Sequence, residues 1–128
     1  MTAKVLIIED DVVVVKSTTL VLDTIGCEVH AGIGGEEGLQ KAKALRPDLI
    51  LLDIMMPDMD GWQVLMRLKG DPDTRNIPVV IFTAYEISRG GEGVIQRGAV
   101  GLVQKPFEPE ELLDIVRRNV AGAAQSSL

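Results

Sequence analysis

Short runs of apolar residues, each followed by a polar residue, constrain the fold of this chain most. They are rich in aliphatic and β-branched side chains and show no alternation with polar residues, as expected of strands buried on both faces of a sheet. The runs cover residues 5–8, 49–52 and 79–82, with a weaker one at 101–103 and a less regular candidate at 28–31. The chain is therefore predicted to form a sheet that is covered on both sides.

Segments with helical spacing separate these strands and cover residues 12–25, 36–45, 60–69 and 109–120. Asp11 is a suitable N-cap for the first of them, and Gly26 suits its C-terminal end. Parallel strands need crossover connections, which are usually helices. The alternation therefore predicts an α/β fold with a parallel sheet and helices on both faces.

Length, charge and cysteine content narrow the class of protein. The 128 residues suffice for one domain, and the formal net charge of -6 argues against nucleic acid as a partner. Cys27 is the one cysteine of the sequence, which excludes an internal disulfide. No apolar segment approaches the roughly 20 residues that span a bilayer. We expect a cytoplasmic domain over residues 1–122 and a frayed tail over 123–128.

Polar residues with useful chemistry follow the predicted strands. Ligands of open parallel sheets bind at the carboxyl ends of the strands, where these residues converge. They are Glu9, Asp10, Asp11, Asp53, Thr83 and Lys105. Converging carboxylates repel one another unless a cation lies among them, and oxygen ligands without His or Cys favour Mg²⁺. An Asp carboxylate can then act as a nucleophile toward a phosphoryl group, with Lys105 and Thr83 contacting its oxygens. The combination predicts phosphoryl chemistry at Asp53.

The motifs that contain these residues resemble those of a known family, the receiver domains of bacterial two-component response regulators. They read VLIIEDD at 5–11, PDLILLDIMMPDMDG at 47–61, IPVVIFTA at 77–84 and KPF at 105–107. The resemblance covers essentially the whole chain. It implies a doubly wound, flavodoxin-like fold with five parallel strands in the order 2-1-3-4-5.

The resemblance also implies a role for each motif residue. Asp53 would be the phosphoacceptor, and Mg²⁺ would bind to Glu9, Asp10, Asp53 and the backbone carbonyl of Met55, while Asp11 would serve as an N-cap. Thr83 and Lys105 would contact the phosphoryl group, with Ala84 and Tyr85 in the switch segment and a cis bond before Pro106. The phosphoryl donor would be a sensor histidine kinase or a histidine phosphotransfer protein, and dimerisation on phosphorylation is a further expectation.

Three features depart from the usual family pattern or refine it. Leu102 occupies the position of a switch Tyr or Phe, which predicts an output route without the aromatic switch. The expected fourth helix, residues 85–98, contains Gly90, Gly91 and Gly93, which predicts a weak and mobile helix. Bulky side chains at Met55 and Tyr85 are expected to flank the phosphoryl group and slow its hydrolysis.

Several alternatives stay open or are set aside. The chain could be a switch without its own output domain, the amino-terminal receiver of a longer regulator, or a phosphorelay intermediate. In none of these would it be an enzyme beyond its own phosphorylation and dephosphorylation. A distant alternative is a Mg²⁺-dependent phosphatase, which would need a second Asp where Met55 stands. A dinucleotide loop starting at Gly32 fails because its last glycine position is Glu37. We interpret the glycines at 32–38 as loop flexibility.

Overall fold

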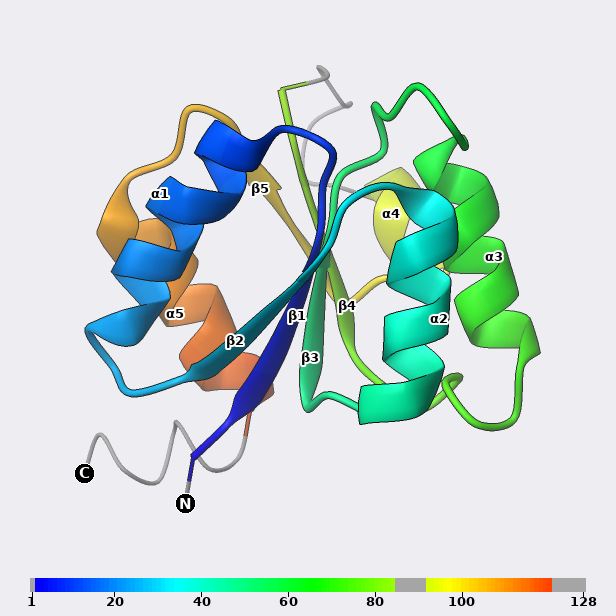
Figure 1. Ribbon diagram of the computed structural model, residues 1–128, viewed down its shortest axis with the longest axis horizontal. Coiled ribbons are helices and arrows are strands. Elements are labelled where there is room, and N and C mark those ends of the chain that lie inside the picture. The colour runs from blue at the N-terminus through cyan, green and yellow to red at the C-terminus, as the bar shows by residue number, and fades with distance from the viewer. Residues whose placement is uncertain (1, 85–91, 121–128) are drawn as a thin grey trace.

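The computed structural model describes residues 2–84 and 92–120 and contains one sheet of five parallel strands (Figure 1). The strands are β1 (Lys4–Ile8), β2 (Glu28–Gly32), β3 (Leu49–Leu52), β4 (Val79–Thr83) and β5 (Gly101–Gln104). Their order is β2-β1-β3-β4-β5, and every neighbouring pair is parallel. The predicted fold class and strand order are confirmed.

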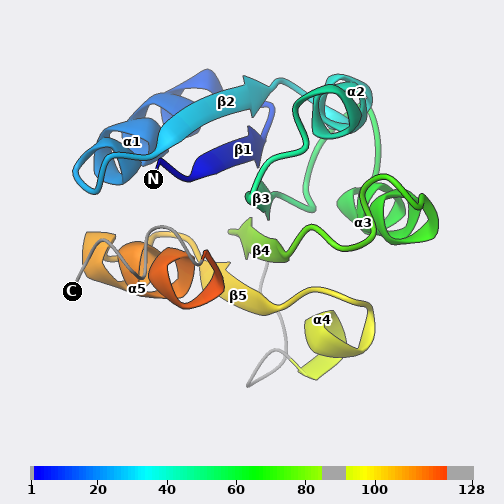
Figure 2. The same cartoon turned by 90° about the horizontal axis from the view of Figure 1, so that it is seen from below.

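Helices cover both faces of the sheet (Figure 2). They are α1 (Val12–Asp23), α2 (Gly35–Leu45), α3 (Gly61–Gly70), α4 (Glu92–Gln96) and α5 (Pro109–Asn119). Buried residues of α1 and α5 share one core with the sheet, and those of α2, α3 and α4 share the other. Within β1, Val5 and Ile7 point into the first core, whereas Leu6 and Ile8 point into the second. The strands are continuous apolar runs because both of their faces are buried.

The ends of α1 show how the sequence sets helix boundaries. Asp11 caps the helix as predicted, since its Oδ1 accepts hydrogen bonds from the backbone N–H groups of Val13 (2.9 Å) and Val14 (3.4 Å). The helix ends at Asp23, two residues earlier than expected. After Asp23 the backbone forms hydrogen bonds between residues three positions apart. Gly26, with φ of 77°, donates its backbone N–H to the carbonyl of Asp23 at 3.1 Å.

Gly32, at the end of β2, and Gly38, within α2, correct the prediction of a flexible loop. A Cβ on Gly38 would lie 2.5 Å from Cγ2 of Ile8 in β1, and a Cβ on Gly32 would lie 2.6 Å from the Cα of Gly38. Both glycines are buried, and Gly38 is part of α2. Because neither residue has a side chain, α2 can approach β1 and β2 closely. Sequence patterns do not separate this role of glycine from flexibility.

Parts of two predictions lie outside the described residues. Of the expected fourth helix, Tyr85, Gly90 and Gly91 fall outside them, and α4 itself covers Glu92–Gln96. The tail at 123–128 also lies beyond the described ranges. In residues 2–84 and 92–120, no helix is both long and apolar enough to cross a membrane.

Candidate functional site

The carboxyl ends of β1 and β3 bring three acidic residues together. Glu9 follows β1, Asp10 comes next, and Asp53 follows β3. One carboxylate oxygen of each lies within 4.8 Å of the others. The backbone N–H of Asp53 donates to the carbonyl of Ile8 at 3.0 Å, which fixes the two strand ends side by side. Glu9 is 1% exposed and Asp53 5%, so two of these charges are buried.

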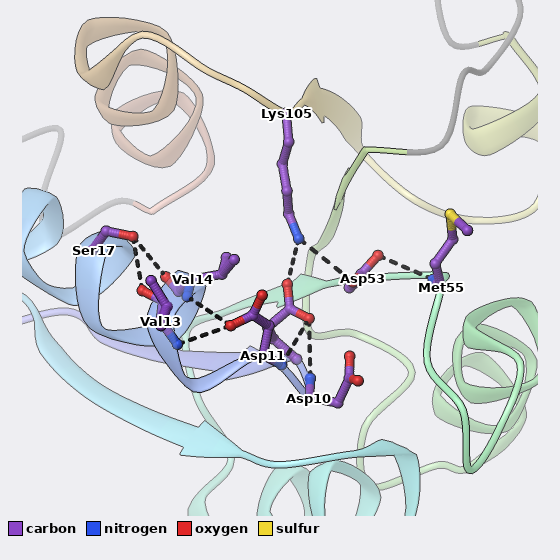
Figure 3. A network of polar contacts seen from close by, with 9 residues as sticks. Asp10, Asp11, Val13, Val14, Ser17, Asp53, Met55 and Lys105 are labelled. Carbon is purple, nitrogen blue, oxygen red and sulfur yellow. Dashed lines mark hydrogen bonds and ion pairs between the residues drawn. The ribbon is translucent and has the colours of Figure 1, made fainter.

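Lys105 reaches this acidic cluster from the end of β5 (Figure 3). Its Nζ donates a short hydrogen bond to Oε1 of Glu9 and lies 3.5 Å from Oδ2 of Asp53. The backbone N–H of Lys105 donates to the carbonyl of Thr83 at 2.8 Å, so the lysine is anchored to the neighbouring strand. The bond between Lys105 and Pro106 is cis, as the resemblance implies.

Burial makes the acidic cluster electrostatically unfavourable without a further cation. The pKa of Glu9 is raised to about 7: desolvation by burial is the largest cause, the neighbouring Asp53 adds to the shift, and Lys105 opposes it. The Oε2 of Glu9 accepts from the backbone N–H groups of Asp10 (3.0 Å) and Asp11 (3.2 Å). When all three carboxyl groups are ionised, their combined negative charge exceeds the single positive charge of Lys105. Oxygen donors of this kind fit Mg²⁺, which binds a few carboxylates and retains several waters.

The two oxygens of Asp53 have different surroundings. Oδ1 accepts a hydrogen bond from the backbone N–H of Met55 at 3.0 Å, on the side away from Lys105 (Figure 3). Oδ2 faces the ammonium group of Lys105. The side chain of Met55 is 55% exposed and lies at the rim of the site. The carboxylate is thus oriented by one backbone donor and one cation.

The remaining predicted site residues that the structure describes lie on β4 and β5 or directly after these strands. Thr83 is buried at the end of β4, and its register partner on β5 is Gln104. Ala84 is exposed and lines a cavity with Lys105 and Pro106. Leu102 pairs with Ile81 and is half-buried against the core shared by α2, α3 and α4. Tyr85 is outside the described residues.

Two contacting pairs of residues near the site are not predicted from the sequence. The carboxylate of Asp58 accepts from the backbone N–H of Gly35 at the start of α2 (3.1 Å and 3.0 Å). The guanidinium of Arg97, just after α4, lies 4.4 Å from the ring centroid of Trp62 in α3. Each pair joins residues far apart in sequence. The sequence offered one indication of the Asp58 contact: Gly34, the N-cap residue of α2, has no side chain that could cap the helix.

Comparison with known proteins identifies the family of this chain. The model of the response regulator receiver domain matches residues 5–117. The DNA-binding dual master transcriptional regulator RpaA of Synechocystis sp. is 37% identical over 89% of this chain, which spans 47% of RpaA. The polar-differentiation response regulator DivK of Brucella ovis is 31% identical over 96% of this chain, and the match covers 100% of DivK. The chain thus spans about half of RpaA and all of DivK.

A solved structure agrees with the fold. The receiver domain of the sensor histidine kinase PA1611 from Pseudomonas aeruginosa PAO1 has a TM-score of 0.84 and 25% identity, covering 94% of this chain and 99% of that one. It is described with a magnesium ion coordinated in its active-site cleft. Family match, relatives and sheet order agree, and the chain belongs to the receiver domains of two-component response regulators.

Proposed function

We propose that this receiver domain, residues 1–122, accepts a phosphoryl group on Asp53 and works as a phosphorylation switch. The observation that carries the proposal is the setting of the Asp53 carboxylate, which is buried beside Glu9 and Asp10 with its Oδ2 3.5 Å from Nζ of Lys105. The donor is a phosphohistidine on a sensor kinase or a histidine phosphotransfer protein. Such phosphohistidines are made with ATP, so we place the chain in the cytoplasm.

The side chains divide the chemistry among them. Oδ2 of Asp53 attacks phosphorus, a P–O bond forms, and the P–N bond to the donor histidine breaks as its imidazole takes up a proton. Lys105 offsets the charge of the incoming phosphoryl oxygens. Glu9, Asp10, Asp53 and the backbone carbonyl of Met55 would hold Mg²⁺. When bound, that ion screens the acids and the phosphoryl group from each other.

The outcome of phosphorylation would be read through β4 and β5. We propose that the Thr83 hydroxyl donates to a phosphoryl oxygen. Since β4 and β5 are paired, a shift at Thr83 reaches Gln104 and its neighbours. Leu102 offers an aliphatic side chain where the family usually has an aromatic ring, so the signal passes without an aromatic switch. The chain acts as a phosphoacceptor that supports its own phosphorylation and dephosphorylation, rather than as an enzyme with a separate substrate.

Two classes of relative suggest the cellular context. DivK is matched over its entire length, which supports a single-domain switch. RpaA extends well beyond the match, which supports an amino-terminal receiver joined to an output domain. A relay intermediate would pass the phosphoryl group onward to a second histidine. Incubating a sensor kinase, the chain and a histidine phosphotransfer protein together tests this case, because a relay requires that the phosphotransfer protein be labelled only when the chain with an intact Asp53 is present.

Intact mass spectrometry tests the acceptor. After incubation with acetyl phosphate and Mg²⁺, the wild type should gain about 80 Da, whereas Asp53→Asn should gain nothing. Asp60→Asn is the matched control. Asp60 is an exposed acid on the same loop that caps α3 through its Oδ1, and Asn preserves that cap. It should label like the wild type. Labelling of Asp53→Asn at the wild-type rate would contradict the proposal.

The exposed side chain of Met55 is expected to slow hydrolysis of the phosphoryl group. It lies at the rim, two residues beyond Asp53, where it can hinder the attacking water. Met55→Asn should therefore accelerate dephosphorylation several-fold, measured as the decay of the labelled mass after acetyl phosphate is removed. Met66→Asn, another exposed methionine but on α3, should leave the decay rate unchanged. Equal decay for all three proteins would show that Met55 does not shield the site.

A further inference from the structure

The glycine-rich turn before α2 receives an acidic side chain from the loop that follows Asp53. Oδ1 and Oδ2 of Asp58 accept from the backbone N–H of Gly35 at 3.1 Å and 3.0 Å, and Oδ2 lies 3.5 Å from the N–H of Glu36. These donors belong to the first turn of α2, where backbone N–H groups lack partners within the helix. A carboxylate there is also favoured by the helix dipole.

The shape of the turn matches this carboxylate. Gly34 has φ of 101°, in the region that favours glycine, and a Cβ there would lie 3.0 Å from Oδ2 of Asp58. A Cβ on Gly35 would lie 2.8 Å from the Cβ of Met59. The N-cap residue Gly34 supplies no side-chain cap of its own. Asp58 therefore caps α2 although it lies 23 positions from Gly35 in the sequence, and the two glycines leave room for the loop that carries it.

The loop over residues 54–60 is attached at two further places. At its base, the N–H of Gly61 donates to the carbonyl of Ile54 at 3.1 Å. Near its beginning, the N–H of Met55 donates to Oδ1 of Asp53. Asp58 provides the attachment on the side of α2, so the loop is tied to the acceptor, to its own base and to a neighbouring helix. The carbonyl of Met55, which we assign to Mg²⁺, follows in the chain the attachment made by its own N–H and precedes the attachment made by Asp58.

We infer that Asp58 is a positioning residue for the Mg²⁺ site. Its hydrogen bonds to the start of α2 hold the loop so that the Met55 carbonyl stays beside the acidic cluster. Asp58 is exposed and lies outside the cluster of Glu9, Asp10 and Asp53, so it acts through the loop rather than as a ligand. The inference rests on the proposed function, because it concerns the metal of that same site.

Isothermal titration with Mg²⁺ alone, on the unphosphorylated full chain, tests this role. Asp58→Ala should raise the Mg²⁺ dissociation constant about tenfold, a size typical of residues that orient metal ligands. Asp58→Asn retains one acceptor oxygen for the N–H of Gly35, so its dissociation constant should lie between those of the wild type and the alanine variant. Circular dichroism at the titration temperature confirms that each variant is folded.

One variant on the α2 side separates positioning from a general loss of helix stability. Glu37 belongs to the same helix end, where its Oε2 accepts from the N–H of Ile33 at 2.8 Å and lies 3.5 Å from Nζ of Lys41, two partners outside the loop. Glu37→Ala should therefore leave Mg²⁺ affinity unchanged.

The outcomes distinguish this inference from the proposed function. If the wild type binds no Mg²⁺, the metal assignment itself is wrong, and the role of Asp58 is lost with it. If the wild type binds Mg²⁺ and Asp58→Ala binds it equally well, the metal assignment stands and the positioning role is wrong. If Glu37→Ala weakens binding as much as Asp58→Ala, the stability of α2 is responsible, and the role of Asp58 is again refuted.

Discussion

Gly61→Ala is expected to lower the free energy of unfolding by about 3 kcal/mol, the upper part of the range for overpacked positions. A Cβ on Gly61 would lie 2.2 Å from the Cα of Ile54 and 2.6 Å from the carbonyl oxygen of Asp53. Both are backbone atoms, so no side-chain rotation can relieve the overlap. Either the first turn of α3 or the exit of β3 must move. Urea denaturation followed by circular dichroism measures the loss.

Gly70→Ala is the matched control at the other end of α3. A Cβ there meets no atom within 4 Å, so the added methyl group fits without strain. Alanine also restricts the unfolded chain, and the variant should gain about 0.5 to 1 kcal/mol. If Gly61→Ala is as stable as Gly70→Ala, the backbone near Asp53 adapts freely and the packing argument is wrong.

The Gly61 substitution should also affect the proposed chemistry. Of the two backbone atoms that the new methyl group meets, one is the carbonyl oxygen of Asp53, the proposed acceptor residue, and the other is the Cα of Ile54. The backbone hydrogen bond between Gly61 and Ile54 closes the loop at this point. A shift of this backbone changes the direction of the Asp53 carboxylate relative to Lys105. Labelling by acetyl phosphate should therefore slow in Gly61→Ala, under conditions where the variant is still folded, and not in Gly70→Ala.

Much of the fold could be predicted because its signals are local. The run at Leu49–Leu52 is a buried strand in sequence and in structure, and Asp53 directly after it lies at the strand end. Asp11 and the helix it caps are likewise encoded by neighbouring residues. The strand order is different, because parallel runs of similar composition do not specify their neighbours. It followed from the resemblance to the receiver family and was confirmed by the structure.

The missed features depend on contacts between distant residues. Gly38 is small because Ile8 lies against it, and Asp58 is an α2 cap although 23 positions separate it from Gly35. Neither relation leaves a periodic pattern in the sequence. Glycines that permit close packing and glycines that permit flexible loops look the same in one sequence. The proposed positioning role of Asp58 therefore became visible only once α2 and the loop after β3 were placed side by side.

In the absence of divalent metal, the free energy of unfolding should fall as the pH rises from about 5 to 8. The folded protein raises the pKa of Glu9 to about 7 from an ordinary value of 4.5, chiefly because the carboxyl group is buried. Between these values the folded state binds more protons than the unfolded state, so raising the pH favours unfolding. The stabilisation from the neutral carboxyl is complete below the unfolded pKa and is lost as the pH passes the folded one. The loss should be on the order of 2 to 3 kcal/mol.

Urea denaturation in EDTA measures the free energy of unfolding at each pH. Two variants test whether Glu9 causes its decline. Glu9→Gln keeps a neutral side chain at every pH and should flatten the decline between pH 5 and 8. Glu37→Gln is the control, because the pKa of the exposed Glu37 is lowered by its bond to the N–H of Ile33. Glu37 is thus ionised throughout this range, and its replacement should leave the slope unchanged. A wild-type slope equal to that of Glu9→Gln would mean that Glu9 is charged in the folded protein and that Lys105 outweighs burial.

Adding Mg²⁺ should reverse the decline in the wild type, because the ion binds the ionised carboxylates of the folded state and not the unfolded chain. The gain in the free energy of unfolding should be larger at pH 8 than at pH 6, since protonated Glu9 competes with the metal at the lower pH. Glu9→Gln should gain less than the wild type at pH 8, having lost one of the charges that attract the ion. An equal gain in both proteins would remove Glu9 from the proposed ligand set while leaving Asp10 and Asp53 in it.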